Sequence, residues 1–284
     1  MLLNMEIKNL EDITTEELVA VFNLSFSDYI VPFQLTLEQL ESKIASEDIK
    51  LDLSLGVFDS DKIVGFMLHG LRVDDSGSTV YNAGTGVIPD YRGQGLVGKM
   101  YEELIPQLKV LHVRKMVLEV IQENQPAVKA YEKVGYAVSR KLDCFSGKLD
   151  ILKHNKDVVI KQTSELKWNE FVPSWEIQPT WQNAVPTLEN IKELCSFAIA
   201  YKHNVQVGYV VFNAVSGKVH QFAVVPDYRN MGIGSSLFSY INDAVKGREV
   251  YVYNVDDRSV STVCFLKKVG LSKKVVQFEM IREV

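Results

Sequence analysis

The sequence predicts an α/β protein made of two tandem copies of one mixed-sheet fold, residues 1–150 and 151–284. Three observations support this. The length of 284 residues exceeds that of one typical domain. The segment Val87–Arg92 recurs as Val224–Arg229, 137 residues later. β-rich runs alternate with amphipathic helical stretches in each half. The polar stretch 153–157 is the predicted joint.

The flanks of the repeated segment keep the same register. Small changes of offset are what loop insertions and deletions produce. The further matches are Gly95 with Gly232, Val64-Gly65 with Val207-Gly208, and Lys133-Val134-Gly135 with Lys268-Val269-Gly270. The repeat therefore extends over most of both halves.

Composition excludes several classes of protein. Hydrophobic residues make up 46% and charged residues 24%, which are globular values and argue against disorder or coiled coil. No apolar run approaches the roughly 18–20 residues of a membrane helix. The first eight residues lack the pattern of a signal peptide. Cys144, Cys195 and Cys264 are too far apart for a metal motif. We therefore expect reduced thiols, no bound metal and a cytoplasmic protein.

Charge is distributed unevenly along the chain. The net charge of −5 argues against nucleic-acid binding, which needs a basic surface. Residues 1–150 carry 15 Lys and Arg against 23 Asp and Glu, while residues 151–284 carry 16 against 13. The acidic first half is either an ordinary solvated surface or a surface that attracts a cationic amine.

The first copy shows a regular order of elements. Apolar spacing predicts a helix, a hairpin, a strand, a helix with Pro106 near its end, a buried strand, and a helix capped by Asn124. The ranges are 14–26, 53–68, 80–88, 96–108, 116–121 and 124–134. This order predicts an α/β unit around a mixed sheet.

A glycine-rich turn, Arg92–Gly98, lies between the predicted strand and helix. Backbone N–H groups at such a helix start can bind phosphate, and the helix dipole favours the negative charge. The spacing also spells G-x-G-x-x-G, as in dinucleotide-binding folds. The second copy keeps only Arg-x-x-Gly, and residues 89–92 intervene after the strand, so a dinucleotide enzyme is disfavoured.

With these residues the chain resembles the GNAT acyltransferases, the Gcn5-related N-acetyltransferase superfamily, over most of both halves. The signature is Arg/Gln-x-x-Gly-x-Gly/Ala after a Val-x-Pro strand end. The second copy matches it fully, and the first has Val97 where Gly or Ala is usual. The resemblance implies acetyl-CoA binding, with pyrophosphate on the turn and pantetheine along the Val87 strand. The implied contacts come from Val87, Arg92, Gly93, Gln94, Gly95, Leu96, Val97 and Asn124, and from Arg229, Asn230, Met231, Gly232, Ile233 and Gly234.

The resemblance also implies the catalytic groups. Tyr131 would protonate the coenzyme A thiolate, and Glu119 would be the base, as in the ribosomal-protein alanine acetyltransferases of the family. The alternatives are a core tyrosine and a structural carboxylate. Asp28 and Tyr29, in an aromatic segment, are the candidate substrate-binding residues, and Asp28 is also a fallback base.

The second copy lacks these acid and base groups. At an offset of 135 it has Asn254, Ser259 and Leu266 where the first copy has Glu119, Asn124 and Tyr131. Nearby residues that could substitute for the acid and the base are Tyr251, Tyr253, Asp256 and Asp257. The tryptophans of this copy, Trp168, Trp175 and Trp181, are interpreted as core or interface aromatics. The second copy is therefore predicted to be degenerate in catalysis.

The predicted function is an acetyl-CoA-dependent N-acetyltransferase with a catalytic first copy. The acceptor would be a small-molecule amine or a peptide N-terminus, with no nucleic-acid or membrane partner. The main alternative is an acyl-CoA binding or sensing protein that does not catalyse transfer.

Overall fold

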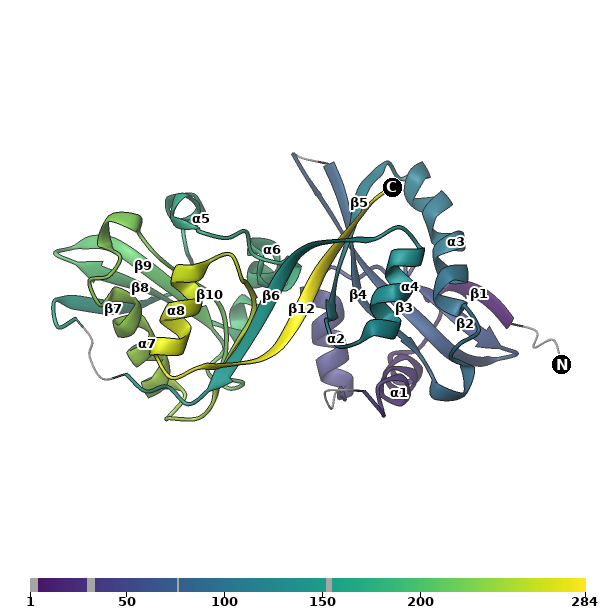
Figure 1. The fold of residues 1–284 in the computed structure, drawn as a ribbon, viewed down its shortest axis with the longest axis horizontal. Helices are drawn as coiled ribbons and strands as arrows, with labels where there is room; N and C mark the ends of the chain where they lie inside the picture. The colour runs from purple at the N-terminus through teal and green to yellow at the C-terminus, as the bar shows by residue number, and fades with distance from the viewer. Residues whose placement is uncertain (1–4, 30–33, 76, 152–154) are drawn as a thin grey trace. The chain divides into compact units, whose positions relative to one another are not determined.

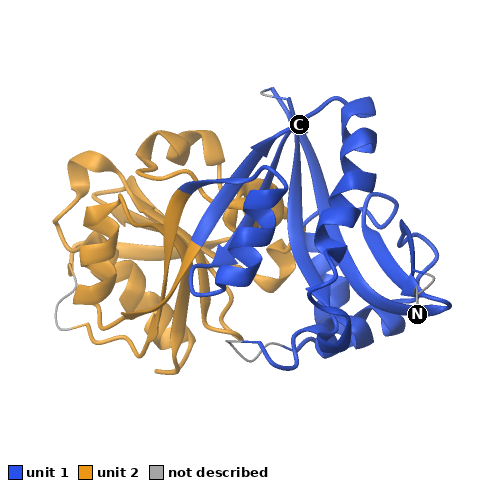
Figure 2. Ribbon diagram, turned by 45° about the vertical axis from the view of Figure 1, so that its right-hand side comes forward, with its two compact units in different colours: residues 1–139, 278–284 blue, residues 140–277 orange. Residues whose placement is uncertain are grey.

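A computed structural model describes residues 5–29, 34–75, 77–151 and 155–284. The chain forms two compact units (Figure 2): unit 1 is Met1–Ser139 with Phe278–Val284, and unit 2 is Arg140–Gln277. The expected division at residue 150 follows the sequence repeat and stays a prediction. Of the expected joint, residues 153 and 154 lie outside the described residues.

Unit 1 contains the elements predicted for the first copy (Figure 1). Its helices are α1 Thr15–Ser25, α2 Leu37–Ser46, the 3-10 turn Pro89–Tyr91, α3 Leu96–Val110 and α4 Gln125–Lys133. Its strands are β1 Met5–Asn9, β2 Leu55–Asp59, β3 Lys62–Asp74, β4 Gly77–Val87 and β5 Val113–Ile121. They lie in the order β1-β2-β3-β4-β5, and the end of β12 (Ser272–Glu283) follows β5.

Local sequence signals explain these boundaries. Thr14 caps α1 with a reciprocal capping box, in which its hydroxyl accepts from the Glu17 N–H at 3.2 Å. Asn124 caps α4 by accepting from the Ala127 N–H at 3.3 Å, as predicted. Helix α3 continues past Pro106 to Val110, and its predicted apolar face is buried. The sequence-based assignment of these elements is confirmed.

Unit 2 repeats the plan. Its strands are β7 Val158–Thr163, β8 Ser196–Lys202, β9 Val205–Phe212, β10 Lys218–Val224 and β11 Val250–Asp256, with the end of β6 (Ala137–Gly147) beside β11. The order is β6-β11-β10-β9-β8-β7. Its helices are α5 Trp168–Phe171, α6 Val185–Asn190, α7 Ile233–Ala244 and α8 Val260–Lys268, and short 3-10 turns lie at Val172–Ser174, Trp181–Asn183, Lys192–Leu194 and Pro226–Tyr228.

Each unit has its own core. In unit 1, the rings of Phe22 on α1 and Phe66 on β3 stack with centroids 5.3 Å apart. In unit 2, α7 packs its buried face, which includes Leu237 and Phe238, on the sheet. The fold is therefore the predicted α/β arrangement with a mixed sheet in each repeat.

The two parallel strands of each unit separate partway along their length. β4 pairs with β5 from Ser78–Val113 to Asn82–Leu118 and then continues to Val87. β10 pairs with β11 at Lys218–Tyr251 and Val219–Val252. This splay leaves strand edges that a ligand can pair with.

A β-bulge lies at each splay. The pairings Leu68–Gly84 and His69–Asn82 leave Ala83 as the extra residue of β4. The pairings Phe212–Val219 and Val211–Gln221 leave His220 as the extra residue of β10. Because these residues are 137 apart, the bulge belongs to the repeat.

Two further findings concern composition. The three cysteines are free, as expected for reduced thiols. Within the described ranges, no helix is both long and apolar enough to cross a membrane.

Candidate active site

The glycine turn of unit 1 is open. Gly95 begins α3 with φ +72° and Gly93 has φ +76°, values that favour glycine. Apart from atoms of its own chain neighbours, a Cβ added at either glycine, or at Gly98, would meet no atom of the described residues within 4 Å. No side chain caps the start of α3. The turn therefore presents backbone at a positive helix end, where an anion can approach.

The turn of unit 2 has the same backbone but is covered on one side. Gly232 has φ +78°, and a Cβ there would meet Asn155 at 3.2 Å. The Asn155 side chain donates to the Met231 carbonyl at 2.7 Å. In unit 2, Asn155 therefore lies against the glycine turn.

Val97 replaces a glycine without disturbing the fold of the turn. In unit 2 a Cβ on Gly234 would meet the Phe265 ring at 3.0 Å, so glycine is needed there for packing against α8. At the offset of 135, unit 1 has Ala130 where unit 2 has Phe265. Unit 1 thus has the larger residue on α3 and the smaller on α4, and unit 2 has the smaller on α7 and the larger on α8. The combined volume of the two residues is similar in both units.

The signature arginines hold the turns to neighbouring segments. Arg92 Nε donates to the Val87 carbonyl at 3.0 Å, Nη2 donates to the Ser25 carbonyl at 2.9 Å, and both Nη atoms bond to Asp28 at 2.7 Å. Asp28, expected at the substrate, is thus paired with Arg92. Both side chains are about half exposed.

Arg229 repeats this arrangement. It donates to the carbonyls of Val224 at 3.2 Å and Ser174 at 2.9 Å, and it lies 3.6 Å from Glu176. Since both arginines use the same three kinds of partner, the structure supports a positioning role for this residue. A cofactor contact by either arginine stays a prediction.

The other predicted turn residues are placed as follows. Leu96 and Ile233 are buried and point into the cores, whereas Met231 is 45% exposed and Gln94 is exposed. Asn230 has φ +61°. Gln94, Met231 and Asn230 are thus exposed, as is Arg92.

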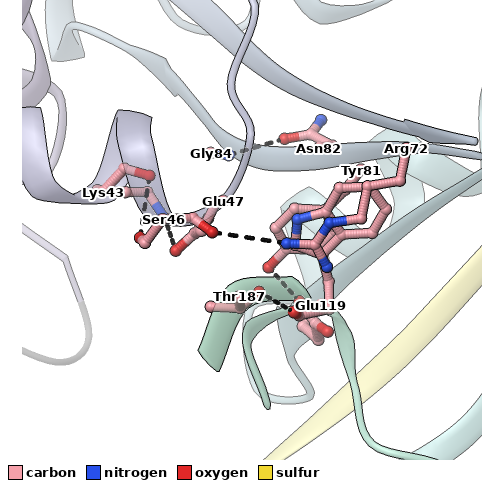
Figure 3. A network of polar contacts seen from close by, with 10 residues as sticks. Lys43, Ser46, Glu47, Arg72, Tyr81, Asn82, Gly84, Glu119 and Thr187 are labelled. Atoms are coloured by element: carbon pink, nitrogen blue, oxygen red, sulfur yellow. Dashed lines mark hydrogen bonds and ion pairs between the residues drawn. The ribbon is translucent and has the colours of Figure 1, made fainter. Parts of the chain in front are cut away.

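Glu119 lies where β4 and β5 separate. Tyr81 on β4 donates to its Oε2 at 2.5 Å (Figure 3). Its other oxygen, Oε1, is buried and meets no hydrogen-bond donor in the described parts of the chain. Burial raises the pKa of Glu119 to about 7, and the carboxylates of Glu279 and Glu47 also raise it, while the Tyr81 bond lowers it. A carboxyl with this pKa can take up and release a proton near neutral pH.

Tyr131 lies on the buried face of α4, 9% exposed. Burial raises its pKa to about 12, a hydrogen bond with the Thr85 side chain lowers it, and the nearby Tyr29 raises it. The structure therefore brings Tyr29, a predicted substrate residue, close to Tyr131. Among the described residues no hydrogen bond joins Tyr131 to Glu119.

The sequence reasoning missed the residues of β4 that support these groups. Asn82 donates to Tyr101 at 2.9 Å and to Thr85 at 2.8 Å, and its own carbonyl oxygen accepts from the Gly84 N–H at 3.0 Å (Figure 3). Tyr81 holds Glu119, as described above. The available signal was the group of polar residues Tyr81, Asn82 and Thr85 within the predicted strand 80–88.

Unit 2 uses its corresponding positions differently. Asn254 is buried and donates to Thr180 at 3.2 Å, Leu266 is fully buried, and the Ser259 hydroxyl donates to Glu176 at 2.7 Å. Asp256 is paired with Arg258 at 2.6 Å. That the second copy is degenerate in catalysis stays a prediction.

Unit 2 nevertheless contains a cavity of about 520 Å³. It reaches from the turn at Asn230–Gly234 to His220 and Tyr253. Trp175 lines it, and Trp168 packs edge-on against Tyr209, so the interpretation of the three tryptophans as core or interface residues stays a prediction. No cluster of His, Cys, Asp or Glu suited to a metal occurs in the described ranges.

Comparison with known proteins gives the family. A model of the acetyltransferase (GNAT) family matches residues 18–136, and a model of the acetyltransferase (GNAT) domain matches residues 193–270. The chain therefore belongs to the GNAT acetyltransferase family, and its two copies are tandem GNAT domains.

Curated relatives match parts of the chain. The [ribosomal protein bS18]-alanine N-acetyltransferase of Escherichia coli is 26% identical over 127 residues, 45% of this chain and 79% of that protein. N-alpha-acetyltransferase 30 of Schizosaccharomyces pombe is 27% identical over 32% of this chain, and mycothiol acetyltransferase of Corynebacterium aurimucosum is 37% identical over 19%. The matched segment spans 61% of the yeast protein and 18% of the mycothiol enzyme.

Solved structures match the whole fold. A GCN5-related N-acetyltransferase from Sphaerobacter thermophilus aligns with a TM-score of 0.72 at 14% identity, covering 98% of this chain and 95% of that one. A tandem GNAT protein from the clavulanic acid biosynthesis pathway aligns with a TM-score of 0.71 at 13% identity, covering 99% and 98%. At these identities the likeness supports the shared tandem fold.

Proposed function

We propose that the chain is an N-acetyltransferase that moves an acetyl group from acetyl-CoA to a primary amine by direct attack in a ternary complex, with the chemistry in unit 1. The observation that carries this proposal is Glu119, which stands at the splay of β4 and β5 with a buried oxygen that meets no donor among the residues that the structure describes. An amine N–H is a donor that this oxygen could accept.

Glu119 would remove the proton that prevents attack. The amine nitrogen forms a bond to the thioester carbonyl carbon, its proton passes to Glu119, and the carbon–sulfur bond breaks with its electron pair on sulfur. The fixed Tyr81 hydrogen bond orients the carboxylate for this transfer. The reaction needs only the amine, the thioester and a proton acceptor. The main contribution of the protein to the rate is therefore to hold these groups in alignment.

Tyr131 would give a proton to the departing thiolate. Burial keeps its hydroxyl protonated at neutral pH, because the pKa is raised to about 12. The proximity of Tyr29 and Thr85 fixes the hydroxyl on the side of α4 that faces β4. Glu119 and Tyr131 thus supply the base and the acid from two different elements.

The open turn supports binding of the coenzyme. Gly93 and Gly95 allow a pyrophosphate to approach the first amides of α3 closely. The pantetheine arm would pair with β4 beyond Asn82, along the edge that ends at Val87, as an added strand does. Asn124, which caps the start of α4, is also proposed as a contact of the coenzyme.

The acceptor is proposed to be a small amine or a peptide N-terminus. A base with a pKa of about 7 is better matched to an α-ammonium, whose pKa is about 8, than to a lysine, at about 10.4. Two relatives are named N-alpha-acetyltransferase 30 and [ribosomal protein bS18]-alanine N-acetyltransferase, names that describe acetylation at an α nitrogen and at an alanine nitrogen. Both considerations favour an α-amine.

Release of free thiol from acetyl-CoA tests the function directly. The full-length chain is mixed with acetyl-CoA and, in separate reactions, an alanine-initiated peptide, spermidine and glucosamine. We expect thiol release that requires an amine, together with an acetylated amine in the mass spectrum. Binding of acetyl-CoA without release in all three reactions would instead favour the non-catalytic binding protein.

A pair of glycine variants tests the coenzyme site. Gly95→Leu forces a side chain into a left-handed position at the open turn, so we expect the KM for acetyl-CoA to rise at least about tenfold, which corresponds to ~1.4 kcal/mol of binding. Gly98→Ala is the matched control, because its Cβ also meets open space but its backbone is ordinary helix. Equal KM values in the two variants would remove this turn from the coenzyme site.

A further inference from the structure

The cavity of unit 2 has chemically distinct ends. One end is the turn at Asn230–Gly234, at the start of the 12-residue helix α7; Lys268 and Arg229, which lies 3.6 Å from Glu176, also line the cavity, as does Glu176 itself. Phe222 and Val252 are apolar residues of its lining, and His220 lies where β10 and β11 separate. A ligand of this cavity would carry an anion at one end and a largely apolar arm, and it would reach His220.

A β-bulge places His220 at this point. Bulges re-aim single side chains and are common beside active sites. The same bulge in unit 1 carries Ala83, which is small and cannot move a proton. Unit 1 has Glu119 on the strand across the splay, and unit 2 has Asn254 there. The two units thus place their titratable group on opposite strands.

The imidazole is held but incompletely bonded. It makes a hydrogen bond with the backbone of Gln182, and its Nδ1 is buried with no partner among the described residues. An unpaired buried acceptor destabilises the folded chain, and a ligand donor that bonds to it would remove this cost. Burial, with Lys218, holds the pKa of His220 well below its usual range, so the ring is neutral and its unpaired Nδ1 can accept a hydrogen bond from a ligand.

Neighbouring side chains fix the wall of the cavity beside the ring. The Trp175 indole donates to Tyr209 at 2.7 Å, and Tyr209 donates to Gln221 at 2.7 Å. Gln221 in turn donates to the Asn183 carbonyl. This chain of bonds immobilises the residue that follows His220.

We propose that the cavity of unit 2 is a second acyl-transfer site, in which His220 takes the proton of an attacking amine and returns it to the departing thiolate. This inference rests on the proposed use of an acyl-CoA thioester. One residue serves both steps because Leu266 stands where Tyr131 would be and has no proton to give.

The transfer balances without another reactant. The amine nitrogen bonds to the acyl carbon, its proton passes to the imidazole, and the carbon–sulfur bond breaks with its electron pair on sulfur. The imidazolium then gives the proton to the thiolate, which leaves His220 neutral. The products are an amide and free coenzyme A.

The test uses a full-length chain in which unit 1 is disabled by Glu119→Gln and Tyr131→Phe. We measure thiol release from acetyl-CoA with an alanine-initiated peptide, spermidine and glucosamine. Residual release is expected with at least one amine, and adding His220→Gln should lower it at least tenfold. Glutamine keeps a hydrogen-bonding group but cannot shuttle a proton.

Tryptophan fluorescence reports separately on binding to unit 2, because all three tryptophans, Trp168, Trp175 and Trp181, lie in that unit. Coenzyme A should change the emission equally with and without His220→Gln, which also shows that the variant is folded. Gly232→Trp, which obstructs the turn, should lower residual release even where His220 is intact.

The inference is overturned if the disabled chain releases no thiol with any of the three amines, if release survives His220→Gln, or if coenzyme A leaves the emission unchanged. These outcomes differ from failure of the proposed function, in which the unaltered chain itself releases no thiol or keeps its rate after the unit 1 substitutions.

Discussion

Replacing Tyr131 by phenylalanine is expected to lower kcat about 10²-fold while leaving the KM for acetyl-CoA nearly unchanged. The substitution removes one hydroxyl and almost no volume, so the buried face of α4 keeps its packing. Without the hydroxyl the thiolate leaves unprotonated, and loss of a general acid costs about 10²–10⁴-fold. An effect on kcat and kcat/KM alike marks an interaction made in the transition state.

Tyr136→Phe is the matched control for this variant. The Tyr136 ring lies edge-on to Tyr131 with centroids 5.8 Å apart, and its hydroxyl is 3.1 Å from that of Tyr101. We expect its kcat to stay within about threefold of the unaltered chain, with ~1 kcal/mol of stability lost with the hydrogen bond. If both variants lose activity equally, Tyr131 acts through packing of the tyrosine cluster.

Replacing Glu119 by glutamine is expected to lower kcat/KM by at least about 10²-fold and to remove the acidic limb of its pH profile. In the unaltered chain the rate should rise with pH through about 7, because the base must be ionised to accept a proton. Rates measured from pH 5.5 to 8.5 test both statements. A profile that keeps its acidic limb in the variant would assign that limb to another group.

The same substitution should change stability with pH. Glu119 has a pKa of about 7 in the folded chain against an ordinary 4.5, so the folded chain binds more protons between these values. Its contribution to the free energy of unfolding therefore falls as pH rises from about 4.5 to 7 and stays low above 7.

Glu119→Gln removes this cost of ionisation. We expect the free energy of unfolding to rise by about 1–3 kcal/mol at pH 8 and to change little at pH 5. The lower part of that range applies because Glu119 is partly accessible to solvent. Denaturant unfolding followed by circular dichroism measures both. Glu123→Gln is the control, since Glu123 is exposed on the same segment. Equal stabilisation by both variants would contradict a buried, destabilised carboxyl.

Local signals explain why much of the fold could be predicted. Asn124 and Gly95 each determine the start of a helix from within a few residues, and the repeated Arg-x-x-Gly segment placed both turns correctly. Their geometry depends on φ values and hydrogen bonds between residues close in sequence. Repetition of the segment strengthened each assignment.

Contacts between distant residues could not be predicted in this way. Arg92 meets Asp28 across 64 positions, and Tyr81 meets Glu119 across 38. The bulge at His220 follows from the strand register with β9, which no run of residues in β10 specifies alone. For this reason the sequence analysis overlooked His220, although the matching position Ala83 lies beside the predicted site.

Unit 1 can complete its fold only after the end of β12 has been synthesised. Residues 278–284 belong to unit 1 but are translated after all of unit 2. They complete the sheet beside β5, where Val284 donates to the Arg114 carbonyl at 3.1 Å, and Arg282 donates to Val134 at the end of the helix that carries Tyr131. At about 5–20 residues per second, the nascent chain holds β5 as an unpaired edge for roughly ten to thirty seconds. A chain stalled within unit 2 would therefore carry an unfinished unit 1, and the helix that carries Tyr131 would gain this last support only when translation passes residue 282.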